Sequence, residues 1–122
     1  MSVYVVAPLC AKAEEELAGH GGKAGDLRVR AVCLPSAESS QKLDLAQIGA
    51  NARRATEDHS SIGYIGERTR SASRFSAPIL EEAGIAQLSA ISGAAGMEKL
   101  LRAVEDAGDP SSPRQSVFDQ LE

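Results

Sequence analysis

The sequence has few aromatic residues, and this shortage limits how its core can be built. Only 3% of its 122 residues are aromatic and none is Trp, whereas 43% are hydrophobic. The core must therefore consist mainly of Ala, Val, Ile and Leu, whose small side chains let helices and strands approach closely. A chain of this length lies in the usual size range of one domain, so we expect one core.

Long apolar runs and basic blocks are also missing. No segment approaches the roughly 20 apolar residues that a helix needs to cross a bilayer. The 13 basic and 17 acidic residues are scattered, which gives a net charge of -4 and no footprint for a phosphate backbone. We therefore expect neither nucleic acid as a partner nor insertion into a membrane.

The start of the chain lacks the features of a secretory signal. MSVYVVAP reads as a strand, without a charged start, a long apolar stretch or a small-residue cleavage site. We expect either a cytoplasmic protein, if this start is natural, or a protein whose signal has been removed.

Two cysteines, Cys10 and Cys33, are too few for a disulfide scaffold and lack the paired spacing of a zinc site. The favoured interpretation is two unrelated small apolar residues, because free cysteine commonly behaves as a buried hydrophobe. A disulfide stays open as the alternative, since both residues would lie near the carboxyl ends of neighbouring strands. Their Cα separation decides between the two.

The residue pattern predicts alternating strands and helices. Segments rich in β-branched and other apolar residues read as strands at 2–7, 28–34, 61–66 and 85–89. Helical periodicity or strong helix formers read as helices at 11–18, 45–57, 76–84, 97–104 and 113–121. Met97, Leu100, Leu101 and Val104 form the clearest apolar helix face.

Two helix starts carry specific signals. Asp44 can cap the second helix, with Gln47 completing a capping-box-like pair. Pro78 fits best in the first turn of the third helix, so we place the start of that helix near Ser76. The second helix has an apolar face made of four residues, Leu45, Ile48, Ala52 and Ala55.

This order of elements predicts an α/β fold. We expect a flavodoxin-like, three-layer αβα sandwich with a four-stranded parallel sheet in the order 2-1-3-4 and helices on both faces. The strand order then reverses between the first and third strands. A ligand is expected at the carboxyl ends of the strands there, beside the loops 8–12, 67–73 and 89–93.

These loops show no recognisable catalytic group. The first, PLCAKAEEE, lacks the Gly-rich turn that wraps a phosphate, and the first and third strands do not end in the acidic residues of a phosphoacceptor site. His20 and His59 fall at helix ends, away from the expected crevice. We therefore expect no enzyme, no metal and no cofactor.

The segment Ser71, Ala72 and Ser73 is more suggestive. It lies just before or within the first turn of a helix, where unpaired backbone N–H groups and hydroxyls can bind a carboxylate. That chemistry suits an amino-acid ligand. The alternative, in which the serines only cap their own helix, stays open.

Several of these segments together resemble a known family. NARRATED at 51–58, IGYIGE at 62–67, SAS at 71–73 and SAPILEEAGIAQLS at 76–89 resemble the first lobe of type 1 periplasmic binding proteins. The opening VYVVAPL at 3–9 and LRVRAVCL at 27–34 fit the same lobe. The group most similar in pattern is the branched-chain amino acid receptors of ABC transporters.

The resemblance implies a site and a domain division. In that family the first lobe holds the carboxylate and ammonium groups of the ligand in the loops after strands three and four. By position, the residues implied here are Ser71, Ser73, Ser89, Ala90 and Ser92. The family's second lobe has no counterpart, so residues 1–92 resemble a lobe core and residues 93–122 resemble the C-terminal returning helices.

Two hypotheses follow. The first is a solute-binding module for an amino-acid-like ligand, weakened by the missing lobe, with an ABC permease as partner and a periplasmic or extracellular location implied by the resemblance. The second is a truncated or engineered single lobe that acts only as a structural domain. Such a lobe would form a homodimer through its exposed crevice side.

Overall fold

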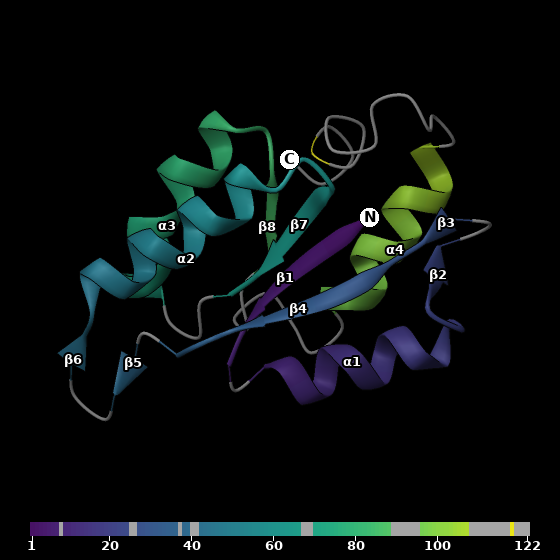
Figure 1. Cartoon of the computed structure of the whole chain (residues 1–122), viewed down its shortest axis with the longest axis horizontal. Helices are drawn as coiled ribbons and strands as arrows, with labels where there is room; N and C mark the ends of the chain where they lie inside the picture. Colours follow the sequence, from purple (N-terminus) through teal and green to yellow (C-terminus); the bar gives the residue numbers. More distant parts are fainter. Residues whose placement is uncertain are drawn as a thin grey trace.

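Four short strands form a parallel sheet at the centre of the computed structural model (Figure 1). They are β1 (Ser2–Val6), β4 (Arg30–Leu34), β7 (Ser61–Ile65) and β8 (Ala86–Leu88). Their order is β4-β1-β7-β8 and every pairing is parallel, which confirms the predicted order 2-1-3-4. The structure describes residues 1–7, 9–24, 27–36, 38–39, 42–66, 70–88, 96–107 and 118.

Helices cover both faces of this sheet (Figure 1). One face is covered by α1 (Cys10–Gly19) and α4 (Gly96–Ala107), and the other by α2 (Leu45–Glu57) and α3 (Arg70–Glu82). The three-layer αβα arrangement is consistent with the predicted flavodoxin-like fold. No helix in the described part of the chain is both long and apolar enough to cross a membrane.

The core is divided into two parts by the sheet. Along β1, Val3 and Val5 pack toward α1 and α4, whereas Tyr4 and Val6 pack toward α2 and α3. This alternation follows from the two-residue period of a strand. On α4, the predicted apolar face is fully confirmed, since four side chains are at most 5% exposed: Met97, Leu100, Leu101 and Val104.

The predicted second strand, 28–34, is wrong at its start. Residues Leu27–Arg28 form β3, which pairs with β2 (Lys23–Ala24) in an antiparallel hairpin. Val29 separates β3 from β4, and its backbone N–H donates to the carbonyl of Gly22 rather than continuing the central sheet. A second small hairpin, β5 (Glu38–Ser39) with β6 (Lys42–Leu43), lies between β4 and α2.

The predicted start of the third helix near Ser76 is also wrong. Helix α3 begins at Arg70, so Pro78 lies well inside it. Burial of Ala72, Ser76 and Leu80, spaced four residues apart, keeps this helix continuous against the core. Pro78 and the residue four positions earlier, Arg74, are both exposed, so solvent can reach the carbonyl that loses its hydrogen bond.

Helix α2 confirms its predicted cap but differs in two details. The Asp44 carboxylate accepts a hydrogen bond from the Gln47 backbone N–H at 3.0 Å. The Gln47 side chain does not complete a capping box, because it donates to the Asn51 side chain at 2.7 Å. Leu45 was predicted on the buried face and is 51% exposed, since the buried stripe begins one turn later at Ile48.

The cysteines are bonded to each other, so the favoured interpretation of two unrelated apolar residues is wrong. The Cα atoms of Cys10 and Cys33 are 5.7 Å apart, within the range of a disulfide. Cys10 begins α1 directly after β1, and Cys33 lies near the end of β4, the neighbour of β1 in the sheet. The pairing of these two strands therefore brings the two sulfur atoms together.

Candidate functional site

The carboxyl edge of the sheet is where the sequence places a ligand site. Helix α3 begins there, shortly after β7 ends, and β7 lies next to β1 at the point where the strand order reverses. Ser71 and Ser73 occupy the first turn of α3; the first side chain is exposed and the second is half-buried. The macrodipole of α3 gives this first turn a partial positive charge, which favours an anion there.

Ala72, which lies between these two serines, is in a different environment. The Ala72 side chain is fully buried and packs with Ile48 of α2. Its side chain is therefore not placed to contact a ligand. This packing fixes the first turn of α3 against α2, so the two flanking serines stand on a supported helix.

The other predicted site residues, Ser89, Ala90 and Ser92, lie outside the described residues. The same holds for the rest of the loop 89–93, for Pro8, for Glu67 and for the helix predicted at 113–121 apart from position 118. The structure thus brings Ser71 and Ser73 to the expected edge and gives no placement for the residues after β8.

A polar bridge at this edge was missed by the sequence interpretation. The Gln87 side chain of β8 donates to the Ser76 hydroxyl of α3 at 2.7 Å and to the carbonyl of Gly66 at 2.9 Å. Ser76 is fully buried and its hydroxyl also donates to the carbonyl of Ser73 at 3.3 Å. A polar residue inside the apolar segment IAQLS was the signal that could have revealed this bridge.

A second bridge holds α2 at the same edge. The buried Asn51 side chain donates to the carbonyl of Pro35, just after β4, at 2.9 Å, and it accepts from Gln47. Together with the Cys10–Cys33 disulfide, these contacts tie the helices to the ends of the strands. The carboxyl edge is therefore supported by polar and covalent contacts rather than by apolar packing alone.

A further polar cluster lies at the opposite, amino edge of the sheet. The Tyr4 hydroxyl donates to Asp58 at 2.7 Å, and Asp58 also accepts from the Ser60 hydroxyl and backbone N–H. The Ser60 hydroxyl also contacts the Ser2 hydroxyl at 2.8 Å, and the Arg30 Nε donates to Ser2 at 2.9 Å. This cluster ties the turn after α2 to the first residues of β1 and β4.

The cluster sets the ionisation of its members. Hydrogen bonds from Ser60, Tyr4 and the Ser60 backbone lower the pKa of Asp58 to about 2. Burial, and then the hydrogen bond to Asp58, raises the pKa of Tyr4 above its ordinary value. Asp58 is thus fully ionised near neutral pH, which suits a structural hydrogen-bond acceptor better than a general base.

Acid should remove the contribution of Asp58 to stability. The folded-state pKa of about 2 lies below the ordinary value of 3.8, so the stabilisation is present above about pH 3.8 and is lost as pH falls through 2. After allowance for solvent screening, we expect ionised Asp58 to contribute about 1 kcal/mol to the free energy of unfolding. In denaturant unfolding, the difference between wild type and Asp58→Asn should shrink by that amount from about pH 6 to about pH 2. A difference independent of pH would contradict this assignment.

The histidines lie away from the carboxyl edge. His20 is the C-terminal cap of α1 and His59 is exposed just after α2, so both are at the amino edge. Within the described ranges, no three His, Cys, Asp or Glu side chains are grouped so that they could hold a metal ion.

Comparison of the chain with known protein families, with curated proteins and with solved structures gives no match.

Proposed function

We propose that the chain is a solute-binding module similar to one lobe of an ABC transporter substrate-binding protein, with no catalytic activity. Its ligand is amino-acid-like, of the branched-chain type, and binds at the carboxyl ends of the strands. The observation that supports this proposal most is the first turn of α3, which carries Ser71 and Ser73 beside the point where the strand order reverses.

The chemistry of this edge suits an aliphatic amino acid. The ligand carboxylate lies at the electropositive N-terminal end of α3, beside the hydroxyls of Ser71 and Ser73. Leu9, just after β1, and Leu88, the last residue of β8, are half-buried at the same edge. Such partly exposed leucines offer apolar contact to a branched side chain.

The disulfide supports an extracytoplasmic location within this proposal. Disulfides persist in the periplasm and outside the cell and are rare in the cytosol. The Cys10–Cys33 bond closes the first loop against the end of β4, which holds one wall of the proposed site. In this interpretation the module delivers its ligand to an ABC permease.

A single lobe covers a small ligand from one side only, so we expect weak binding. Effective small-molecule sites bury most of the ligand surface. Affinity in the millimolar range corresponds to only about 4 kcal/mol, which a one-sided site can supply. Tight binding then requires a second chain that provides the opposing wall.

Calorimetric titration tests the proposal directly. Leucine, isoleucine and valine at millimolar concentration should release heat, and a small amide without a carboxylate should not. The variant Ser71→Ala with Ser73→Ala should lose about tenfold in affinity, because two hydroxyl contacts are removed. Thr56→Ala also deletes a hydroxyl, but near the C-terminal end of α2 and away from the proposed site, so this variant should bind like wild type. An absence of heat with all three amino acids would sink the proposal.

A second candidate function, self-association as a structural homodimer, is favoured by two exposed apolar side chains. Leu45 at the start of α2 is 51% exposed and Phe75 on α3 is 49% exposed. Both belong to helices on the same face of the sheet, so an interface on that face would cover both side chains. Light scattering that shows a strict monomer at high protein concentration would rule this candidate out.

A further inference from the structure

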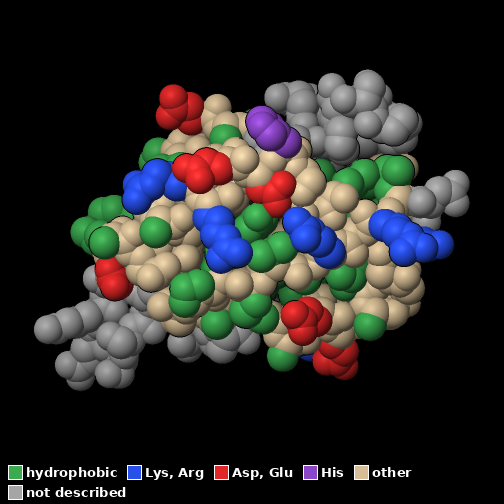
Figure 2. All heavy atoms as spheres, in the orientation of Figure 1, with side chains coloured by type: hydrophobic (Ala, Val, Ile, Leu, Met, Phe, Trp, Pro, Cys, Tyr) green, Lys and Arg blue, Asp and Glu red, His purple; other side chains and the backbone are tan. Residues whose placement is uncertain are grey.

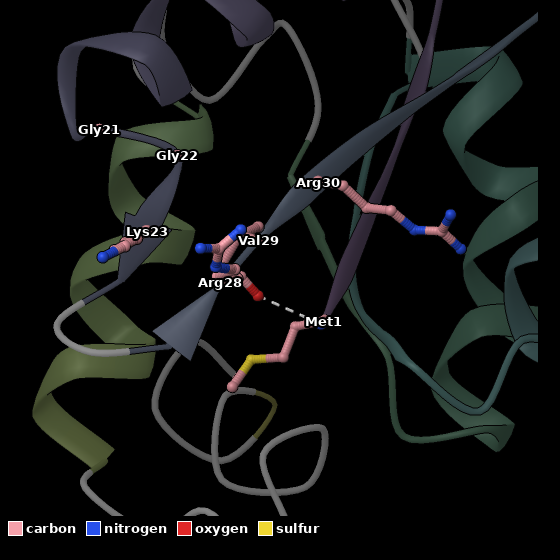
Figure 3. A pocket seen from close by; sticks show the side chains of 7 residues that line it. All are labelled: Met1, Gly21, Gly22, Lys23, Arg28, Val29 and Arg30. Atoms are coloured by element: carbon pink, nitrogen blue, oxygen red, sulfur yellow. Dashed lines mark hydrogen bonds between the residues drawn. The ribbon is translucent and has the colours of Figure 1, made fainter.

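A cavity of about 520 Å³ lies at the amino edge of the sheet, opposite the proposed solute site (Figure 3). Its wall comes from the first residue of the chain, the turn after α1, the β2–β3 hairpin and the start of β4. Seven residues line it: Met1, Gly21, Gly22, Lys23, Arg28, Val29 and Arg30. Its volume lies in the range of sites for small molecules.

The two basic residues of the hairpin occupy directly opposite positions on its two strands. Lys23 of β2 and Arg28 of β3 are direct cross-strand partners, and both are exposed. Like charges in directly opposed positions destabilise a pair of strands. The chain as a whole has a net charge of -4, so a pair of opposed basic residues departs from its overall composition.

The hairpin that carries these charges is well anchored. Ala24, which follows Lys23 on β2, is buried in the core cluster. Its cross-strand partner on β3, Leu27, packs against the same cluster. Buried Val29 follows at once and its N–H bonds the Gly22 carbonyl at 3.0 Å. The period of two along each strand then turns Lys23 and Arg28 away from the core. Both cations therefore project from a fixed backbone.

Arg30 belongs to the polar cluster rather than to this pair. Its Nε donates to Ser2, and its guanidinium lies 3.7 Å from the Asp58 carboxylate. Figure 3 shows its side chain extending away from Lys23 and Arg28. Figure 2 shows blue side chains in a row across the face that is turned to the viewer, with red ones mostly above and below it. Among the side chains that line the cavity, the positive charge thus comes from the hairpin pair, while the Met1 ammonium donates to the carbonyl of Arg28 at 3.2 Å.

We infer that this cavity binds a phosphorylated small molecule, with Lys23 and Arg28 holding the phosphate. The Arg28 guanidinium can give two parallel N–H donors to phosphate oxygens, and the Lys23 ammonium adds a point charge. A dianion between the two cations also removes their mutual repulsion. The remaining volume, beside Met1 and Val29, accommodates the organic part of a phosphate monoester.

An NMR titration of backbone amides tests this inference with three probes: inorganic phosphate, glycerol 3-phosphate and glycerol. At low ionic strength, glycerol 3-phosphate should shift the amides of 21–23 and 28–30, inorganic phosphate should do so more weakly, and glycerol should not. Low salt matters because charge contacts at an open site are screened. No shift in these segments with either phosphate probe at about 10 mM would overturn the inference.

Matched variants separate a defined site from general attraction to positive charge. Lys23→Gln and Arg28→Gln should each weaken glycerol 3-phosphate binding by about tenfold. Lys12→Gln removes an exposed lysine of α1 outside the cavity and should leave affinity unchanged. Equal losses in all three variants, or none in the hairpin variants, would overturn the inference.

Thermal melting supplies an independent readout and a check on folding. Lys23→Gln keeps the buried anchor Ala24 and removes a like-charge contact, so its melting temperature without ligand should be no lower than that of wild type. Glycerol 3-phosphate should raise the melting temperature of wild type, and at the same concentration it should raise that of Lys23→Gln much less. An equal rise in both proteins would contradict the assignment of Lys23.

Discussion

Replacing Cys10 and Cys33 together by serine should lower the free energy of unfolding by about 3 kcal/mol. The bond joins residues separated by 23 positions, and a cross-link of this span restricts the unfolded chain substantially. In the folded protein it fastens the start of α1 to β4. Urea unfolding monitored by circular dichroism measures the loss as a shift of the midpoint.

Reductant provides the matched comparison for this prediction. Cys33 is exposed, so a thiol reagent can reach the bond in the folded protein. Reduced wild type should unfold like the double serine variant, and the variant itself should not respond to reductant. Ala11→Ser, an exposed substitution on the same helix, controls for the added hydroxyl. Equal midpoints for oxidised and reduced wild type would show that the bond is absent or contributes nothing.

Leu100→Ala should cost about 3 to 4 kcal/mol, the second large effect. Leu100 is fully buried on α4, and its side chain lies directly over Gly63 of β7. Truncation leaves a cavity between helix and sheet that the surrounding backbone cannot fully close. Guanidinium or urea unfolding of the variant measures the loss.

Gly63→Ala makes this contact a sharper test. A Cβ at Gly63 would lie 2.6 Å from one methyl carbon of Leu100, so the single substitution should destabilise wild type by about 1 to 3 kcal/mol. In the Leu100→Ala background the clash is gone and the new methyl group fills part of the cavity. The double variant should therefore lose less free energy of unfolding than the sum of the losses in the two single variants.

Leu80→Ala supplies the control for this cycle. Leu80 is also fully buried, but it belongs to the cluster on the other face of the sheet. Combined with Gly63→Ala, its effect should be additive. Additive behaviour of Leu100 with Gly63 would contradict the direct packing of α4 on β7.

The strand order could be predicted because local pattern and chain connectivity agree. Apolar runs such as SVYVV and SIGYI are short, and helical segments between them are long enough for right-handed crossovers. On α4, four apolar residues with regular helical spacing left one orientation that buries them all. Long segments with a regular apolar period could therefore be predicted best.

The two hairpins could not be predicted from pattern alone. Their strands have two residues each, too short for a period of two to be visible. The sequence pattern consequently predicts no element over residues 23–27 and places Arg28 at the start of a longer strand. The predicted third helix starts too late for a related reason. Its predicted start depends on the local cost of Pro78 and takes no account of the burial of Ala72 and Leu80.

The candidate site shows the same limit. Ser71 and Ser73 could be placed at the carboxyl edge because that placement depends only on strand order. The bridge from Gln87 to Ser76 depends on two side chains meeting across a helix and a strand, which no local pattern specifies. The cavity beside Lys23 and Arg28 depends in turn on a hairpin that the sequence pattern did not show.

The two proposed sites lie at opposite edges of one sheet, so a single mapping experiment separates them. Leucine titrated into the oxidised, isotope-labelled protein is the most direct test of the solute-binding proposal. The proposal predicts shifts at the carboxyl edge, in the amides of Ala7, Gly66 and 71–73, with the amino-edge amides of Lys23 and Arg30 unchanged. Saturating leucine that leaves the carboxyl edge unperturbed would contradict it.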